Sequence, residues 1–368
     1  MEALVRIEGA AFCGRRVLVT GHSGFKGGWL CTWLERLGAR VFGYALAPDT
    51  DPALYHVLRL RERVDETIED IRNYDALLRL VRRLQPEIVF HLAAQPLVRR
   101  SYDQPKLTYD TNVGGTVNLL EALRTVGCAR AVVVVTTDKV YENHEWVWGY
   151  RESDRLGGHD PYSSSKACAE LAAASYYDAF FKGGGRTLIA TARSGNVIGG
   201  GDWAQDRIVP DAVRALSSGR AVPVRNPGSV RPWQHVLEPL AGYLLLAGRL
   251  WSGDAGCACA WNFGPDPRSG CSVRGLVELV LGAWGGGEWK DVSTPDARRE
   301  TTLLRLNSEK AEHELGWHPV YDCAQAIRAT VEWYREYYAG CDDMRALTVR
   351  QIEAFEGASV GRALETRR

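Results

Sequence analysis

The hydrophobic pattern of the first half of the chain alternates between short apolar runs and longer amphipathic stretches. Apolar runs of about five residues predict buried strands, and apolar positions three or four residues apart predict helices. The predicted strands cover residues 16–20, 41–46, 88–92, 131–135 and 187–192, and the predicted helices cover residues 27–37, 73–84, 105–126 and 161–181. Continuous apolar strands that alternate with helices predict an α/β fold with a doubly wound parallel sheet, covered on both faces.

The alternation of apolar runs and amphipathic stretches becomes less regular after about residue 195. Three more helices are predicted, at residues 208–218, 236–250 and 272–284, and the loops between them contain proline and glycine. We therefore expect residues 1–194 to form the sheet domain and residues 195–345 to form a smaller, mixed α/β lobe that is interleaved with it. Residues 346–368 are polar with one helical stretch, and we expect them to form a C-terminal arm.

The composition argues against several classes of protein. Lys plus Arg and Asp plus Glu both total 45, so the net charge offers no attraction to nucleic acid or to an anionic membrane. No apolar run approaches the roughly 20 residues that span a bilayer, and the N-terminus lacks a signal-peptide pattern. The nine cysteines form no C-x-x-C pair and have no histidine at metal-ligand spacing, which predicts reduced thiols and no metal site. We expect a cytosolic protein.

Residues 21–27 form a G-x-x-G-x-x-G motif between the first predicted strand and the first predicted helix. Glycines at these positions permit a tight turn and bring backbone N–H groups against a pyrophosphate at the start of the helix. The place of the motif in the first β-α unit predicts a Rossmann-like domain that binds a dinucleotide. The candidate contacts are Gly21, Gly24, Phe25, Lys26 and Gly27. Lys26 either contacts a phosphate or extends its stem along the protein surface.

The residues of this domain leave open which dinucleotide is bound. Residues 43–46 end the second predicted strand without the acid that usually binds the ribose of NAD, and no arginine cluster there indicates NADP. Asp70 and Ile71 follow a further probable strand and are candidates for the adenine site. The alternative for Asp70 is a solvated turn residue, which is the more frequent role of an isolated aspartate.

Two segments carry groups suited to acid–base chemistry. Tyr162 and Lys166 form a Tyr-x-x-x-Lys motif, which on a helix places a phenol and an ammonium on one face. We expect Lys166 to lower the pKa of Tyr162 toward neutrality, so that the phenol can accept a proton from a substrate hydroxyl. Thr137, Asp138 and Lys139 follow the strand at 131–135. An alcohol dehydrogenase needs the hydroxyl but no further acid and base, so Asp138 and Lys139 indicate a second step, the elimination of water.

These features together resemble the extended short-chain dehydrogenase/reductase family. The resemblance rests on residues 21–27, His91-Leu92-Ala93-Ala94-Gln95, Asn112, Thr136 with the three residues after it, and Tyr162 with Lys166. Longer blocks resemble the branch of that family that dehydrates nucleoside-diphosphoglucose, and CDP-D-glucose in particular. These blocks are residues 20–27, 94–98, 141–152, 196–203, 231–236 and 261–264, and the likeness covers roughly residues 14–335.

The resemblance implies a tightly bound NAD that is reduced and reoxidised within one turnover. Further cofactor contacts are then Ala93, Ala94, Gln95 and Thr136, together with Tyr162 and Lys166. Lys166 orients the ribose of the cofactor and supports Tyr162, which takes the proton of the sugar C4 hydroxyl. Thr137 forms a hydrogen bond with the C4 oxygen.

The resemblance also implies separate roles for the acid and the amine. Lys139 is the base at C5, and Asp138 is the acid that protonates the C6 hydroxyl as it leaves. The residue types alone leave open which of the two is the acid and which is the base.

A site for the sugar nucleotide is implied in the second half of the chain. The candidate contacts to the diphosphate are Asn196, Arg207 and Arg231, with Arg193 as an additional candidate. Val224 and Asn226 are candidates for the pyrimidine base, and Glu300 is a candidate for the nucleotide ribose. Trp146, Trp148 and Trp203 either enclose the sugar or belong to the core.

Other functions stay open at this point. A sugar-nucleotide 4-epimerase or decarboxylase on the same scaffold shares Tyr162 and Lys166 but lacks an acid–amine pair after the hydroxyl residue, and a dehydratase for dTDP-, UDP- or GDP-glucose would share the reactive groups. A dinucleotide-binding sensor would have lost at least one of the five reactive groups, and all five are present. The resemblance implies a homodimer, or a dimer of dimers, formed through the helices near 105–126 and 161–181.

Overall fold

The computed structural model describes residues 9–266, 270–293 and 303–365, without the side chains of residues 361–365. Its centre is a seven-stranded sheet in the order β11-β6-β5-β4-β1-β2-β3. The strands are β1 (Arg16–Thr20), β2 (Arg40–Ala45), β3 (Asp65–Ile68), β4 (Ile88–His91), β5 (Ala131–Val135), β6 (Leu188–Arg193) and β11 (Ala260–Asn262). All neighbouring strands of this sheet are parallel. The predicted doubly wound parallel sheet is confirmed.

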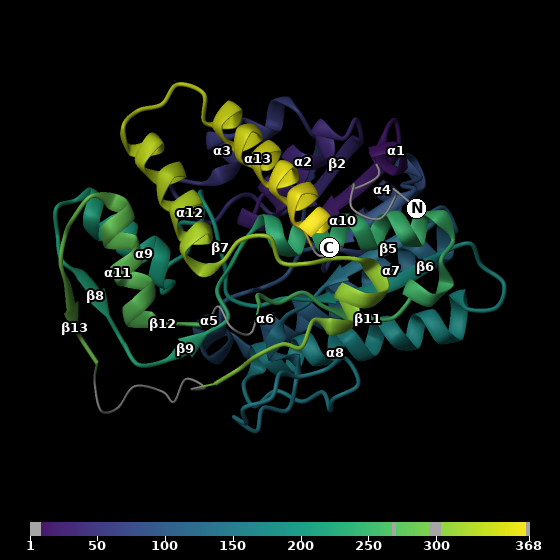
Figure 1. Ribbon diagram of the computed structural model, residues 1–368. Coiled ribbons are helices and arrows are strands. Elements are labelled where there is room, and N and C mark those ends of the chain that lie inside the picture. Colours follow the sequence, from purple (N-terminus) through teal and green to yellow (C-terminus); the bar gives the residue numbers. More distant parts are fainter. Residues whose placement is uncertain (1–8, 267–269, 294–302, 366–368) are drawn as a thin grey trace.

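Helices cover both faces of the sheet (Figure 1). On one face, α2 (Phe25–Arg36) and α10 (Leu237–Ser252) share a core with strand residues that include Val17 and Val133. On the other face, α4 (Tyr74–Leu84), α7 (Gly115–Val126) and α8 (Pro161–Tyr176) share a core with Leu18 and Val132. Because successive strand residues point to opposite faces, both sets must be apolar, which explains the continuous apolar runs.

The two long predicted helices are present with local irregularities. The helix expected over 105–126 consists of α6 (Pro105–Tyr109), a π-helical turn η2 (Asp110–Gly114) and α7. The helix expected over 161–181 consists of α8 and a second π-helical turn, η4 (Tyr177–Phe181). The periodicity therefore identified both helices but not the extra residue that each π turn accommodates.

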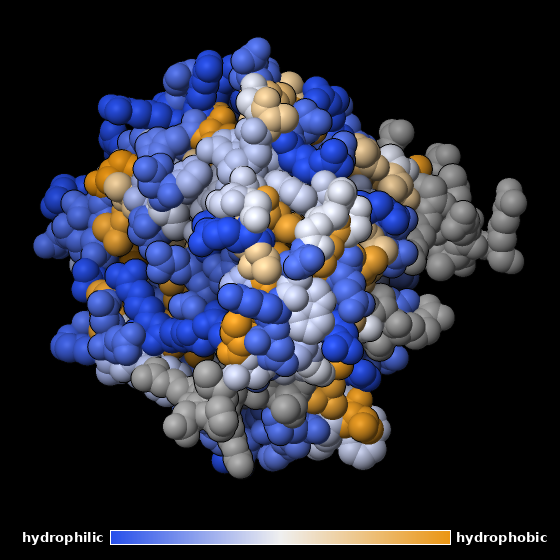
Figure 2. All heavy atoms as spheres, turned by 90° about the vertical axis from the view of Figure 1, so that its left-hand side faces the viewer, coloured by the Kyte–Doolittle hydropathy of each residue, from blue (hydrophilic) through white to orange (hydrophobic). Residues whose placement is uncertain are grey.

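The chain after β6 builds smaller units on one side of the molecule. α9 (Ile208–Ser217), α11 (Val273–Trp284) and the paired strands β8 (Val222–Val224) and β13 (Trp289–Asp291) lie at the left of Figure 1, away from β5, β6 and β11. Figure 2 shows that this side is mostly hydrophilic, with apolar side chains only in small separate groups. Two more short pairs join β7 (Val197–Ile198) to β10 (Gln234–His235) and β9 (Val230–Arg231) to β12 (Cys271–Ser272). Because β11 belongs to the main sheet, this half of the chain contributes to both units.

The C-terminal helix α13 (Met344–Glu365) packs back onto α2, and α12 (Cys323–Tyr338) packs against α11 and α13. α13 buries Met344, Ile352 and Phe355, and the indole N–H of Trp33 in α2 donates to Glu356 Oε1 at 2.8 Å. No helix within the described ranges is both long and apolar enough to cross a membrane.

Candidate active site

The segment that carries the hydroxyl, the acid and the amine turns sharply after β5. Thr137 caps a short 3₁₀ helix, η3 (Asp138–Val140), in which its Oγ1 accepts the Lys139 N–H at 3.4 Å. The backbone N–H of Asp138 donates to the carbonyl of Ser194 at 3.3 Å, which ties the segment to the loop after β6. The carboxyl ends of two neighbouring parallel strands therefore position this segment, as is common for sites in open α/β sheets.

The phenol and the second amine project from the first turns of α8. The helix begins at Pro161 because the carboxylate of Asp160 accepts the Ser163 N–H at 2.9 Å. Tyr162 and Lys166 are both buried, at 8% and 6% exposure. The ammonium of Lys166 donates to the carbonyl of Val135, the last residue of β5, at 3.1 Å. Helix α8 thus brings its two reactive groups directly against the end of β5.

The acid and the amine are adjacent to the phenol. Thr137 Oγ1 donates to Asp138 Oδ1 at 3.0 Å, and Lys139 Nζ lies 3.6 Å from the same oxygen. Asp138 is fully buried, whereas the side chain of Lys139 is 35% exposed. A hydrogen bond joins the hydroxyls of Thr137 and Tyr162, and the charge of Asp138 acts on the pKa of Tyr162. The four groups form one continuous cluster.

The predicted lowering of the Tyr162 pKa is wrong. Burial raises the pKa of Tyr162 to about 12, and the hydrogen bond from Thr137 opposes this shift only in part. Burial also lowers the pKa of Lys166 to about 8. The loss of hydration outweighs the proximity of the two side chains, because charged forms are costly inside a protein.

One carboxylate oxygen of Asp138 accepts no hydrogen bond from the described residues. Its Oδ2 atom is buried and has no hydrogen-bond partner among the described residues. A Cβ atom on Gly195 would lie 1.8 Å from that oxygen, so only glycine leaves room for the carboxylate there. A buried, unpaired carboxylate oxygen is costly and is typical of a group that acts on a ligand.

Lys26 links the glycine turn to this cluster. Its Nζ donates to Ser194 Oγ at 2.9 Å and to Tyr243 Oη at 3.4 Å. Burial lowers the pKa of Lys26 to about 7, aided by the positive charges of Arg207 and Lys166, while Asp138 opposes the shift. The amine therefore lies inside the site, within electrostatic range of both reactive segments, and not along the surface.

The glycine turn fits a pyrophosphate. Gly21 has a left-handed φ of 77°, and a Cβ on it would lie 2.7 Å from the Ala93 nitrogen. A Cβ on Gly27 would lie 2.2 Å from the Gly21 carbonyl oxygen. Gly24 is the N-cap of α2 and provides no side-chain cap, so the first N–H groups of the helix stay available to an anion. Phe25 begins α2 and packs partly against the core.

Most of the other predicted cofactor contacts already interact with neighbouring protein groups. Asp70 is bound by Arg72, whose hydrogen bonds hold the pKa of that carboxyl below its ordinary value, and Ile71 packs on Gly115. Gln95 donates through its side chain to Leu97 and Thr108 within the protein. The Ala93 N–H donates to Thr20 Oγ1 at 3.2 Å, and Ala94 is half-buried in the same loop.

One acid near the cofactor turn was not predicted. Glu66 lies on β3 beside Gly43, and its carboxylate binds the ring of His22 at 2.8 Å and the hydroxyl of Tyr55 at 2.6 Å. Because it comes from a neighbouring strand and not from the end of β2, the usual spacing rule could not have found it.

On the substrate side, Asn196 and Arg207 lie close to the cluster. Asn196 adopts a left-handed φ of 47°, and its buried Nδ2 has no hydrogen-bond partner within the described part of the chain. Arg207 donates to Asp202 Oδ2 at 2.7 Å, which raises its pKa, and its charge acts on Tyr162. A free amide donor and a guanidinium beside the phenol suit a phosphate-bearing substrate.

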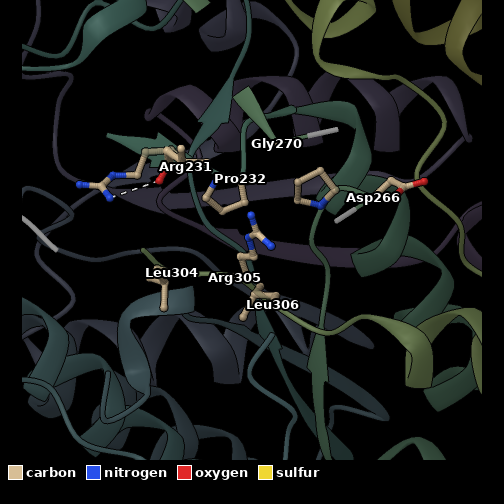
Figure 3. Close-up of a pocket in the computed structure, with 9 residues that line it drawn as sticks. Arg231, Pro232, Asp266, Gly270, Leu304, Arg305 and Leu306 are labelled. Carbon is tan, nitrogen blue, oxygen red and sulfur yellow. Dashed lines mark hydrogen bonds between the residues drawn. The ribbon is translucent and has the colours of Figure 1, made fainter. Parts of the chain in front are cut away.

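A pocket adjoins Arg231 between β9 and residues 304–306. It is lined by Val230, Arg231, Pro232, Pro265, Asp266, Gly270, Leu304, Arg305 and Leu306. In Figure 3 the guanidinium of Arg305 points toward the middle of this pocket, whereas that of Arg231 points away from it. Arg305 is a candidate contact that the sequence did not single out, because isolated arginines are common on protein surfaces.

The remaining predicted substrate residues have different surroundings. Val224 is fully buried at the end of β8, and Asn226 follows with a left-handed φ of 54°, its N–H donating to Ser293 Oγ. Glu300 lies outside the described residues. Trp203 is a core residue that packs on Trp333, Tyr334 and Tyr337, so the core alternative holds for it.

The other two tryptophans lie on the loop after η3. Trp146 stacks on Tyr150 at 5.3 Å between ring centroids, and Trp148 is 67% exposed.

The prediction that Arg193 contacts the diphosphate is wrong, because its guanidinium binds the buried carboxylate of Glu170 through two nitrogens. The sequence did not single out Glu170, since its partner lies 23 residues away.

Comparison with known proteins finds relatives along almost the whole chain. A protein-family model described as GDP-mannose 4,6 dehydratase matches residues 18–246. The chain is 45% identical over 350 residues to CDP-glucose 4,6-dehydratase from Salmonella typhimurium, covering 94% of this chain and 97% of the relative. It is 31% identical over 336 residues to dTDP-glucose 4,6-dehydratase from Streptomyces griseus, covering 87% and 94%. A solved dTDP-glucose 4,6-dehydratase from Streptomyces venezuelae, with NAD bound, matches with a TM-score of 0.75 at 27% identity, covering 89% and 99%.

Proposed function

The chain belongs to the GDP-mannose 4,6-dehydratase family of extended short-chain dehydrogenases/reductases, and we propose that it converts CDP-D-glucose to CDP-4-dehydro-6-deoxy-D-glucose and water. The enzyme is then a hydro-lyase, and its product is a precursor for deoxysugars. The choice of CDP-D-glucose follows the 45% identical relative, which covers nearly the whole chain.

The cofactor in this proposal is NAD, which accepts a hydride from C4 of the sugar and returns it to C6. The glycine turn at residues 21–27 would hold its pyrophosphate, and Asp70 with the residues around Ala93 would line its adenosine side. The close approaches at Gly21 and Gly27 support this assignment, because they leave the start of α2 open to an anion.

Tyr162 begins the reaction by removing the proton of the C4 hydroxyl. Thr137, which already forms a hydrogen bond with Tyr162, holds the C4 oxygen in place. Lys166 lies one helical turn beyond Tyr162, where it positions both the phenol and the ribose of the cofactor. Since burial raises the pKa of Tyr162 to about 12, proton removal depends on cationic neighbours such as Arg207 once the site is filled.

Asp138 and Lys139 carry out the elimination. The 4-keto group makes the C5 proton acidic, Lys139 removes it, and Asp138 donates a proton to the C6 hydroxyl as it leaves. The amine of Lys139 is partly exposed, and the carboxylate of Asp138 is fully buried.

The observation that carries the proposal is the 3.6 Å approach of Lys139 to Asp138 beside the Thr137–Tyr162 pair. A 4-epimerase needs only the hydroxyl, the phenol and Lys166. The additional acid–amine pair therefore favours the dehydratase over the epimerase.

The test replaces Asp138 by Asn and Lys139 by Met in one variant. We expect formation of the 4-keto-6-deoxy product to fall by roughly 10²–10⁴-fold, while NADH still forms slowly on addition of CDP-D-glucose. The matched control changes the exposed pair Asp178 and Lys182, which lie 3.0 Å apart, to Asn and Met. Undiminished product formation in the active-site variant would exclude Asp138 and Lys139 as the groups that eliminate water.

A substrate panel tests the nucleotide. The enzyme is incubated with CDP-, dTDP-, UDP- and GDP-glucose, and the product is followed by absorbance in alkali and by the mass loss of one water. We expect CDP-D-glucose to react fastest, and faster turnover of another sugar nucleotide would replace CDP in the proposal.

We also propose that the enzyme forms a homodimer, or a dimer of dimers, in the cytoplasm. Exposed apolar side chains on and near the two long helices support self-association, namely Tyr102, Tyr109, Leu171 and Phe180. All nine cysteines are free thiols, as in a reducing compartment. Light scattering of a Leu171→Glu variant should show a smaller particle than the wild type.

A further inference from the structure

A buried cluster lies between α8 and the segment that carries Asp138 and Lys139. It consists of Glu170, Arg193 and Tyr141, and we propose that it is a positioning device that couples water loss to sugar oxidation. The inference deepens the proposed function and depends on it. In this view the cluster sets the place of the acid–amine pair relative to Tyr162.

Glu170 is the centre of the cluster. Its Oε1 accepts the hydroxyl of Thr136 and the Arg193 Nε–H at 3.0 Å. Its Oε2 accepts the hydroxyl of Thr191 at 2.5 Å and the Arg193 Nη2–H at 2.9 Å. Glu170 and Arg193 are each 3% exposed, so these charge-assisted bonds operate out of reach of solvent.

Arg193 continues the cluster to the other end of the catalytic segment. Its Nη1 donates to the hydroxyl of Tyr141 at 2.8 Å and to the carbonyl of Glu152 at 3.1 Å. Tyr141 in turn donates to Asn262 Oδ1 at 2.7 Å. Because Thr136 and Tyr141 flank residues 137–140, the cluster holds this segment at both of its ends.

The cluster also fixes the distance from that segment to the phenol. Glu170 lies one helical turn beyond Lys166 and two turns beyond Tyr162, on the same helix. A helix is stiff over two turns, so anchoring Glu170 to both flanks of the segment sets where Asp138 and Lys139 lie relative to Tyr162. A general structural staple would not need to bind both flanks of the segment that contains Asp138 and Lys139.

The two chemical steps should respond differently to loss of the cluster. Oxidation at C4 depends mainly on Tyr162 and Lys166, whose spacing is set by α8. Glu170 affects this step only through its charge, which raises the pKa of Lys166, and through the position of Thr137. Elimination depends on Asp138 and Lys139 in addition, and their position relative to the sugar depends on the cluster. A displaced segment would therefore let oxidation proceed while water loss becomes slow.

The first experiment uses Glu170→Gln with NAD and CDP-D-glucose in a single turnover. We expect water loss to slow by roughly 100-fold and NADH formation to slow much less, so that NADH accumulates. The control is Glu238→Gln, which alters a buried carboxylate that accepts the backbone N–H groups of Val320 and Tyr321, remote from the catalytic segment. The Glu238→Gln variant should leave the ratio of the rate of NADH formation to the rate of water loss unchanged.

A second, milder pair of variants decides the question if Glu170→Gln does not fold. Tyr141→Phe removes only the hydroxyl that binds Arg193, and Tyr150→Phe removes the hydroxyl of the ring stacked on it at 5.1 Å. Both tyrosines are 2% exposed, but the Tyr150 hydroxyl bonds within its own loop. We expect NADH to accumulate in Tyr141→Phe and not in Tyr150→Phe.

The outcomes separate this inference from the proposed function. If the wild type releases no water from CDP-D-glucose, the proposed function fails. If the wild type is active and oxidation and water loss fall by the same factor in Glu170→Gln and Tyr141→Phe, or if neither falls, the cluster is only a structural staple and the inference is overturned.

Discussion

The glycine turn at residues 21–27 and the catalytic segment at residues 136–141 both follow a strand of the same sheet, yet they are held in different ways. The turn is shaped by close backbone approaches, such as the 2.2 Å that a Cβ on Gly27 would leave to the Gly21 carbonyl and the 2.7 Å that a Cβ on Gly21 would leave to the Ala93 nitrogen. The segment is held by side chains and backbone groups from Glu170, Arg193 and Ser194. The turn depends on backbone sterics, whereas the segment is assembled by polar contacts of side chains.

This difference predicts different consequences of mutation. A change in the turn should abolish cofactor binding and every later step together. A change around the segment should affect oxidation and elimination to different extents, because the two steps use different groups in the proposed mechanism.

The largest effect is expected for Gly27→Ala. The added Cβ forces the Gly21 carbonyl to move, so we expect NAD binding and all turnover to be lost and the protein to be destabilised by about 1–3 kcal/mol. The control is Gly24→Ala, whose Cβ would lie 3.4 Å from the same oxygen. NAD titration and denaturant unfolding measure both variants, and equal behaviour of the two would show that the turn is less constrained than its geometry implies.

A smaller and more selective effect is expected for Gly195→Ala. Its Cβ would lie 1.8 Å from Asp138 Oδ2, so the carboxylate must move, and water loss should slow by roughly 100-fold while NADH still forms. Gly282→Ala is the matched control, since a Cβ there meets no atom within 4 Å. Rapid-quench analysis of the keto sugars distinguishes oxidation at C4 from elimination of water. An equal loss of NADH formation would show that the two steps do not respond separately to this change.

The smallest effect is expected in the stability of the protein without cofactor. Burial lowers the pKa of Lys166 to about 8 from an ordinary value of 10.5, so between these values the folded protein binds fewer protons than the unfolded chain. The free energy of unfolding should therefore rise with pH across this window by about 1–3 kcal/mol more in the wild type than in Lys166→Met. Denaturant titrations across the window measure this difference, and parallel pH profiles would show that Lys166 is better hydrated than its burial indicates.

Much of the fold was predictable from the sequence because both faces of the sheet are buried. Five strands and the helices between them are close to their predicted bounds, and β11 was missed because Ala260–Asn262 is too short to show a pattern. The glycine turn and the Tyr162–Lys166 spacing were also visible, since sterics and helical geometry act over only a few residues.

The sequence by itself determined the parallel sheet and the turn that suits a pyrophosphate, and it identified the five candidate reactive side chains, because local periodicity, glycine sterics and residue spacing encode them. Only the tertiary structure decided that Arg193 binds Glu170, that Lys26 enters the site and that the pKa of Tyr162 is raised. These properties depend on burial and on partners 23 to 168 residues apart, which no local pattern records.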